Sequence, residues 1–188
     1  MPSYEACSRF LFELGMLKRI QREGWKLLGI TNEESIADHS LRAAQIGFIL
    51  AKLEGYKNPE TICTMLVFHD ISECRIGDIH KVANRYIHVN EKQVVEEQLN
   101  QLEDIGDAIS TLWDEVENQK TKAGIIAKDA DLIEMVVTAL ELKKKYGVTI
   151  DNWIENTKKR LKTESAKQLL IQLISMNPHG WWQGLKKL

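Results

Sequence analysis

Apolar residues recur at three- and four-residue spacing along most of this chain, which is the periodicity of helices with one buried face. No long stretch alternates apolar and polar residues, or is rich enough in β-branched residues, to indicate a strand. The pattern predicts helices over residues 4–21, 35–53, 59–74, 91–105, 107–118, 122–145, 150–161 and 163–175. Only short pauses separate these segments, so we expect one all-α domain, a helical bundle, over residues 1–188.

Two of the predicted helices have recognisable starts. Ser35 precedes Asp38 by three residues, which is the spacing of a capping box at a helix N-terminus. Asn58 precedes Pro59, which places a capping side chain before a proline at the first helical position. We therefore expect helices to begin at these two points.

Composition narrows the class of protein. The contents of 44% hydrophobic and 28% charged residues are ordinary for a soluble globular domain. The formal charge of -2 lacks the basic excess of nucleic-acid binders, so no nucleic-acid partner is expected. The 3 cysteines are odd in number and form no C-x-x-C pair, which argues against a disulfide framework and suits a reducing cytoplasm. The start of the chain does not resemble a secretory leader and no long apolar run occurs, so we expect a cytoplasmic protein without a membrane partner.

His39 shares one face of its predicted helix with apolar residues. At 100° per residue it lies in line with Ala43, Ile46, Leu50 and Leu53, which is the inward face. Taken alone, such a histidine is usually a core residue satisfied by a single hydrogen bond.

The next predicted helix changes that interpretation. Residues 62–68 are apolar on all sides, the pattern of a helix buried all round, and they run directly into His69 and Asp70. Glu73 follows one turn later, within an arc of about 100°. Ionisable groups at the end of a buried helix are costly unless they share a metal or a dense hydrogen-bond network. A simple His–Asp hydrogen bond is the alternative.

A third helix supplies two candidate carboxylates. Asp129 and Asp131 both lie among aliphatic residues, but about 200° apart around the helix, so only one can face a given site. The periodicity does not choose between them.

Two imidazoles and two carboxylates form a mixed nitrogen and oxygen site. This donor set suits one divalent cation, Mn, Co, Ni, Fe or Zn, better than Ca. Four protein ligands leave room for water only if the coordination number expands to five or six, which favours a catalytic over a structural metal.

Five segments together carry a family resemblance. EESIADHSLR at 33–42 resembles an E-S-x-x-[DE]-H-S-x-R/Q motif, and HDISECRIGD at 69–78 resembles H-D-x-x-E-x-x-x-G-D. Three further segments fall in the expected order along the chain: REGW at 22–25, LWDE at 112–115 and KDAD at 128–131. The chain thus resembles the HD-domain phosphohydrolase superfamily, in particular its single-domain 5'-deoxynucleotidase branch. The resemblance covers residues 8–145, whereas the C-terminal helices over 150–188 match no motif.

The resemblance implies a fold, a metal and a reaction. It implies a helical bundle of the HD-domain type with one divalent metal held by His39, His69, Asp70 and Asp131, the last because it closes the K-x-x-D segment. It implies hydrolysis of deoxyribonucleoside 5'-monophosphates, by a homodimer. Glu73 faces the same space as His69 and is placed to orient or deprotonate water, or to protonate the leaving oxygen. Its alternative role is to fix a ligand histidine.

The resemblance also implies substrate contacts. Arg22, Arg42 and Lys128 are the candidate phosphate donors, although Arg42 could instead reach a structural carboxylate. Trp25 matches an aromatic residue that lines the deoxyribose site, with core packing as the alternative. Asp78, with loop capping as its alternative, and Glu115 or Glu117 resemble sugar contacts. Branch members often carry a proline after the G-D pair and this chain does not, which leaves the shape of that loop and the base preference open.

Other functions are also consistent with the sequence. Another HD phosphohydrolase would act on a cyclic nucleotide, a nucleoside triphosphate or an alarmone, and a degenerate module would bind a nucleotide or a partner protein without turnover. The intact set of candidate ligands argues against the second. Near the C-terminus, Trp181 and Trp182 with Leu185 and Leu188 could seal a subunit contact or pack onto the domain's own core.

Overall fold

The computed structural model describes residues 1–185, which form helices joined by turns and no strand. The α-helices are α1 (Tyr4–Leu14), α2 (Ile36–Leu53), α3 (Pro59–Phe68), α4 (Glu73–Ile76), α5 (Lys81–Asn84), α6 (Glu91–Leu99), α7 (Glu103–Asn118), α8 (Lys122–Tyr146), α9 (Asp151–Arg160) and α10 (Glu164–Ser175). Three short 3₁₀ helices are η1 (Gly15–Lys18), η2 (Glu23–Leu28) and η3 (Asn100–Leu102). The all-α prediction is confirmed.

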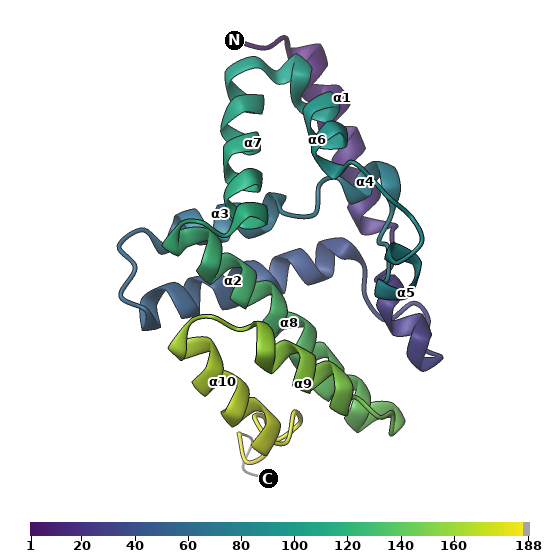
Figure 1. Cartoon of the computed structure of the whole chain (residues 1–188), viewed down its shortest axis with the longest axis vertical. Helices are drawn as coiled ribbons and strands as arrows, with labels where there is room; N and C mark the ends of the chain where they lie inside the picture. The colour runs from purple at the N-terminus through teal and green to yellow at the C-terminus, as the bar shows by residue number, and fades with distance from the viewer. Residues whose placement is uncertain (186–188) are drawn as a thin grey trace.

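The centre of the molecule is built on α2, α3 and α8, which pack on one another (Figure 1). Ile62, Leu66 and Ile133 are fully buried in this core. Gly47 allows the close approach of α2 to α3, because a Cβ there would lie 2.4 Å from Cδ1 of Leu66 and 3.0 Å from Cγ2 of Ile62. This close contact positions the start of α2, which carries His39, beside the end of α3, which precedes His69.

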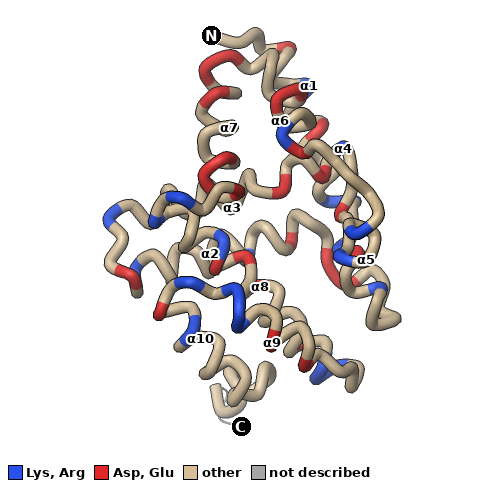
Figure 2. Tube along the Cα trace, in the orientation of Figure 1, with Lys and Arg blue, Asp and Glu red and all other residues tan. Residues whose placement is uncertain are grey.

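Two further groups of helices flank this centre (Figure 1). On one side α1, α6 and α7 bury Phe10, Val95 and Trp113 between them. On the other side η2, α8 and α9 enclose a separate cluster around Trp25 and Ile150. Helix α7 carries acidic residues and no lysine or arginine (Figure 2). The two flanking apolar clusters thus lie on either side of the region between α2, α3 and α8.

The structure confirms both predicted helix starts, but only one of the two predicted side-chain caps forms. The Oγ of Ser35 accepts a hydrogen bond from the Asp38 N–H at 3.2 Å, while the Ser35 N–H donates to Oδ2 of Asp38 at 2.9 Å. Pro59 begins α3 as predicted, but the side chain of Asn58 makes no capping bond. The backbone carbonyl of Asn58 accepts from the Thr61 N–H at 3.0 Å instead, so that donor needs no side-chain cap.

The helix predicted over residues 59–74 is interrupted. Helix α3 ends at Phe68, a turn follows, and the short helix α4 begins at Glu73. The end of α3 is also not buried on every side, because Val67 is 48% exposed. His69 and Asp70 therefore lie in the turn between two helices and not within one continuous helix.

Other boundaries also differ from the prediction. Helix α1 ends at Leu14, and the break expected at Gly106 lies before α7. Gly106 is inside α7, where a Cβ would lie 2.4 Å from the carbonyl oxygen of Leu99, so this glycine serves close packing and does not end a helix. The short helices η2 and α5 fall in stretches that the sequence indicated as pauses. None of the described helices is long and apolar enough to cross a membrane, and all 3 cysteines are free.

Candidate metal centre

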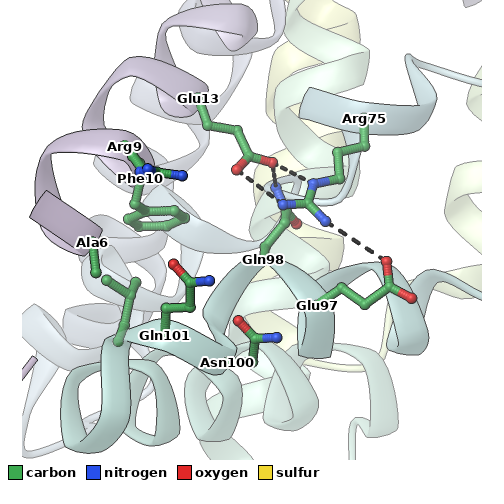
Figure 3. Close-up of a pocket in the computed structure, with 10 residues that line it drawn as sticks. Ala6, Arg9, Phe10, Glu13, Arg75, Glu97, Gln98, Asn100 and Gln101 are labelled. Carbon is green, nitrogen blue, oxygen red and sulfur yellow. Dashed lines mark hydrogen bonds and ion pairs between the residues drawn. The ribbon is translucent and has the colours of Figure 1, made fainter.

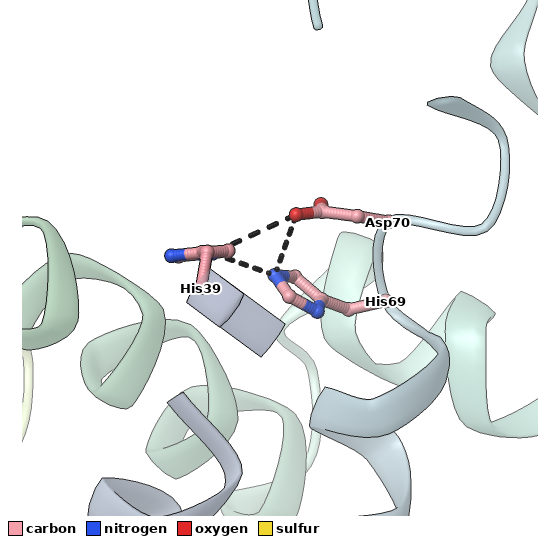
Figure 4. Close-up of side chains that lie close together, drawn as sticks. All are labelled: His39, His69 and Asp70. Atoms are coloured by element: carbon pink, nitrogen blue, oxygen red, sulfur yellow. Dashed lines mark hydrogen bonds and ion pairs between the residues drawn. The ribbon is translucent and has the colours of Figure 1, made fainter. Parts of the chain in front are cut away.

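Two imidazole rings face each other at the centre of the molecule (Figure 4). The Nε2 of His39, from α2, lies 3.3 Å from the Nε2 of His69, which follows α3. Both residues are buried. Two nitrogen atoms that approach each other in this way present their lone pairs, or a shared proton, to the same point.

Two carboxylates complete this cluster. Oδ2 of Asp70 lies 3.1 Å from Nε2 of His69 and 3.6 Å from Nε2 of His39, as the dashed lines of Figure 4 mark. Oδ1 of Asp131 lies 3.3 Å from Nε2 of His39 and 3.9 Å from Nε2 of His69. Ligands about 2.1 Å from a common metal are about 3.0–3.5 Å apart, so these distances are near those of a coordination shell. The set could hold a divalent cation.

Asp129 has a different role from Asp131. Its carboxylate is buried and accepts hydrogen bonds from the Lys162 N–H at 3.0 Å and from the N–H and hydroxyl of Thr163, each at 2.7 Å. Asp129 therefore fixes the backbone immediately before the start of α10. Of the two aspartates that the periodicity left open, Asp131 is the one that the structure brings to the histidines.

The Nδ1 atom of each histidine, which faces away from the centre, makes a hydrogen bond. Nδ1 of His39 lies 2.5 Å from Oε2 of Glu134, a residue that is itself fully buried. Nδ1 of His69 lies 2.8 Å from the carbonyl oxygen of Leu66 in the last turn of α3. Partners at Nδ1 set the tautomer and the ring orientation, so both rings offer Nε2 to the centre.

Arg42 does not enter this centre, in contrast to the phosphate contact that the sequence indicated. Its Nε donates to Oε1 of Glu134 at 2.9 Å, and its Nη1 pairs with Glu141 at 2.9 Å. Thr138 Oγ1 is a further partner. Glu134, which lies behind His39, and Glu141, two helical turns further along the same surface of α8, hold the guanidinium on the far side of the ring.

A network of buried groups continues from Glu134 to Trp25. Oγ1 of Thr138 lies 2.9 Å from Oε1 of Glu134 and 3.1 Å from Oε2 of Glu34. The other oxygen of Glu34 accepts from the indole N–H of Trp25 at 2.9 Å. The orientation of His39 and that of Trp25 thus depend on one set of hydrogen bonds.

The electrostatics of the centre favour a cation. Burial and Arg22 act to lower the pKa of His39, but its contacts with Asp131 and Glu134 raise it to about 10. Burial alone would raise the pKa of Asp70, yet His69, His39 and Arg22 hold it well below its usual range. Oδ2 of Asp70 is buried and has no hydrogen-bond partner among residues 1–185. A carboxylate oxygen that binds a metal directs its lone pair at the cation and not at a hydrogen-bond donor. A buried anionic oxygen without a donor therefore fits a divalent-cation site.

Glu73 lies beside the centre at the first turn of α4 and lines the cavity into which the centre opens. Its Oε2 is buried without a hydrogen-bond partner in the described part of the chain. Burial, Asp70 and Asp78 raise its pKa to about 9. A bound divalent cation would oppose this shift through its charge. The carboxyl group is thus placed to exchange a proton with a bound molecule.

The centre opens into a cavity of about 290 Å³ lined by basic as well as acidic groups. Nη1 of Arg22 lies 3.7 Å from Asp70, and Nζ of Lys128 lies 2.9 Å from Asp131. These are two of the three cations that the sequence indicated for phosphate binding, and both point into this cavity.

Two further cations in the cavity were not predicted from the sequence. Lys81 of α5 and Arg160 at the end of α9 also line it, and neither makes an ion pair with another described residue. Burial and the neighbouring Arg160 lower the pKa of Lys81. No local motif marks either residue, since only the fold brings α5 and α9 to the same cavity.

The two glutamates considered for the sugar are separated by the structure. Glu117 lines the cavity, whereas Glu115 lies outside it and accepts a hydrogen bond from the Thr121 hydroxyl at 2.6 Å. Two residues apart on α7 they point about 200° apart, which explains why only one reaches the cavity. Of the two glutamates, Glu117 is therefore the one that the structure places at the cavity, and Glu115 lies away from it.

Trp25 and Asp78 lie together beside the main cavity, in a second one of about 250 Å³. The Trp25 ring is 3% exposed and stacks on Trp153 at 4.8 Å. Oδ2 of Asp78 accepts from the Glu23 N–H at 2.6 Å, which ties the loop after α4 to η2. Gly77, before Asp78, has φ +74°, a conformation that other residues rarely adopt.

Another cavity, larger than the metal-bearing one, has different chemistry. It measures about 410 Å³ and lies between α1, α6 and η3 (Figure 3). Glu13 pairs with Arg75 at 2.5 Å and accepts from Gln98 at 3.0 Å, while Arg75 also approaches Glu97 (Figure 3). Its charges are paired with one another, so volume alone does not identify the functional site.

Comparisons place the chain among known proteins. The HD domain family profile matches residues 14–172. The 5'-deoxynucleotidase HDDC2 of Dictyostelium discoideum is 31% identical over 176 residues, which cover 86% of this chain and 93% of that protein. The protein of the same name from Homo sapiens is 30% identical over 174 residues, covering 88% and 83%. The solved structure of a conserved hypothetical protein from Pyrococcus furiosus has a TM-score of 0.73 at 26% identity, covering 89% of this chain and 99% of that one.

Proposed function

The chain belongs to the HD domain family, and on that premise we propose that it is a divalent-metal-dependent 5'-deoxynucleotidase. It would hydrolyse a deoxyribonucleoside 5'-monophosphate to the deoxynucleoside and phosphate. The observation that carries the proposal is the convergence of His39, His69, Asp70 and Asp131 within a cavity that also holds Glu73. The relatives named 5'-deoxynucleotidase match over most of both chains, which supports the same reaction here.

The four donors would hold the metal. A divalent cation at this position polarises a phosphate oxygen and lowers the pKa of a bound water. Glu134 and the Leu66 carbonyl keep the two imidazoles directed at that position. The protein thereby presents its ligands in a fixed arrangement before the substrate enters.

Glu73 would move the proton. In the reaction the oxygen of water bonds to phosphorus, the bond between phosphorus and the 5'-oxygen breaks, and a proton must reach that leaving oxygen. Glu73 lies in the cavity with no hydrogen-bond partner on Oε2 among residues 1–185, so it can accept the proton from water and return it to the 5'-oxygen.

The basic groups of the cavity would bind the phosphate. Arg22 and Lys128 lie next to the proposed metal ligands, and Lys81 and Arg160 add charges that no carboxylate of the described chain pairs. A phosphate monoester is a dianion, so several cations in one cavity compensate its desolvation. Trp25, Asp78 and Glu117 are then the candidate neighbours of the deoxyribose.

Phosphate release tests the proposal. The protein loaded in turn with Mn, Co, Ni, Fe or Zn is incubated with pairs of deoxyribonucleoside and ribonucleoside 5'-monophosphates. We expect release from the deoxy compounds and much slower release from the ribo compounds. Equal turnover of both sugars would contradict the deoxy selectivity. Release only from cyclic nucleotides, triphosphates or alarmones would contradict the substrate class, and binding without any release would indicate a non-catalytic module.

We also propose that the chain forms a homodimer. Trp181, Trp182 and Leu185 are 75%, 53% and 72% exposed, so they do not pack onto the domain's own core. Leu188, which the sequence grouped with them, lies outside the described residues. Sedimentation of the wild-type chain and of Trp181→Ala tests whether this segment contributes to a dimer.

A further inference from the structure

We propose that the second cavity, next to the metal-bearing one, binds the nucleobase, and that Asn152 and Asn156 of α9 contact its polar edge. The inference rests on the proposed function, since it assigns the base of the same nucleotide substrate.

The two cavities adjoin each other. The second, of about 250 Å³, shares Arg22, Ile79, Lys81 and Met135 with the metal-bearing cavity of about 290 Å³. A ligand with its phosphate near the metal ligands can therefore extend past Arg22 into the second cavity. A nucleotide has this form, with a charged group at one end and a neutral ring at the other.

The walls of the second cavity suit a flat ring. Trp25, Leu27, Ile79, Met135 and Trp153 line it with apolar surface. The rings of Trp25 and Trp153 stack with an interplanar angle of 20°, which holds the Trp153 ring in place before a ligand arrives. Aromatic side chains stack on the π-face of any nucleobase.

Arg22 and Lys81 are shared with the first cavity, and Asp78 and His80 accept hydrogen bonds from backbone N–H groups. The remaining polar groups of the lining are two amides. Asn152 and Asn156 are four residues apart on α9 and so share one face of the helix. Both line the cavity, both are exposed, and neither side chain has a hydrogen-bond partner among residues 1–185. An amide offers both a donor and an acceptor, the combination that the edges of nucleobases present. Uncharged groups at this end contrast with the cations that face the phosphate.

Kinetics with and without a base test the assignment. The substrates are the four common deoxyribonucleoside 5'-monophosphates and 2-deoxyribose 5-phosphate, which lacks a base. For Asn152→Ala and Asn156→Ala we expect KM to rise about three- to tenfold for the nucleotides, the effect of one lost hydrogen bond, with kcat unchanged. The KM for deoxyribose 5-phosphate should not move. Exposed asparagine to alanine changes within a helix cost no stability, so the variants should fold.

A matched control separates the base contact from a general effect on α9. Glu155→Ala changes an exposed residue between the two asparagines that does not line the cavity, and it should leave every KM as in the wild type. Unchanged KM values in Asn152→Ala, Asn156→Ala and the double variant would overturn the proposal. An equal rise for the substrate without a base would overturn it as well.

Binding of nucleosides gives a second measurement that does not depend on hydrolysis. Saturation-transfer NMR with deoxyadenosine and thymidine should detect binding to the wild type and a loss of signal in the double variant. If the wild type released no phosphate from any deoxynucleotide, the proposed function would fail, but this loss would still support a base site. Absence of nucleoside binding to the wild type would overturn the base site itself.

Discussion

The carboxylate of Glu134 lies 2.5 Å from Nδ1 of His39, on the opposite side of the ring from the nitrogen that faces Asp131. Both partners are fully buried. A neutral amide in place of the carboxylate keeps the shape but removes the charge that increases the basicity of the ring. We expect Glu134→Gln to weaken metal affinity about 10- to 100-fold, measured by calorimetric titration.

Glu141→Gln is the matched control for this change, because Glu141 contacts Arg42 and not the histidine. It should bind metal as the wild type does. Equal metal affinity of Glu134→Gln and the wild type would show that Glu134 does not tune the ring.

Asp131 and Asp129 should differ in what their loss removes. Asp131→Asn takes a charged oxygen from beside His39, so we expect loss of bound metal with the fold retained. Asp129→Asn weakens the bonds to Lys162 and Thr163, so we expect a loss of about 1–3 kcal/mol in the free energy of unfolding with metal still bound. Elemental analysis and urea unfolding measure the two effects. The reverse pattern would exchange their roles.

Replacing Glu73 should separate chemistry from metal binding. Glu73→Gln keeps the volume and removes the exchangeable proton, so kcat should fall about 100- to 10,000-fold. The variant should still bind metal, since the proposed ligands are intact. Loss of metal would instead make Glu73 a ligand, and an unchanged kcat would exclude a role in proton transfer.

Lys81 and Arg160 should affect substrate binding through charge. Removing either leaves one fewer cation in the cavity, and we expect Lys81→Ala and Arg160→Ala to raise KM and to weaken inhibition by inorganic phosphate. Lys158→Ala, an exposed lysine of α9 that does not line the cavity, is the control. Equal inhibition constants in all three variants would contradict a phosphate contact.

Gly124 should be intolerant of a side chain. A Cβ there would lie 2.0 Å from the carbonyl oxygen of Glu115, so the backbone must shift at the junction of α7 and α8. We expect Gly124→Ala to lower the free energy of unfolding by about 1–3 kcal/mol in urea titrations. Gly15→Ala, where no neighbour lies within 4 Å of the new Cβ, should be tolerated.

Local patterns were sufficient for part of the fold and of the site. The capping box of Ser35 depends on residues within one turn, and the apolar face of the following helix directs His39 inward. The order of the motifs then grouped His39 with His69 and Asp70, and the structure brings these three residues together. The cap and the inward face are encoded within short segments, whereas the grouping of the three residues depended on the order of the motifs along the chain.

The remaining features depend on contacts between distant segments. The direction of Asp129 is set by the backbone of Lys162, and the position of Arg42 is set by two carboxylates of α8. Lys81 and Arg160 meet in one cavity only after α5 and α9 have packed. Periodicity within one helix contains no information on such neighbours.

The hydrogen bonds that run from Trp25 through Glu34 and Thr138 to Glu134 have a consequence for how this protein could diverge. Residues in one network change stability and affinity non-additively. If Trp25 lines the sugar site, a mutation that reshapes it for another sugar also disturbs the support of His39. Sugar preference and metal affinity then change together. A variant with a broader sugar preference needs a second substitution that restores metal affinity.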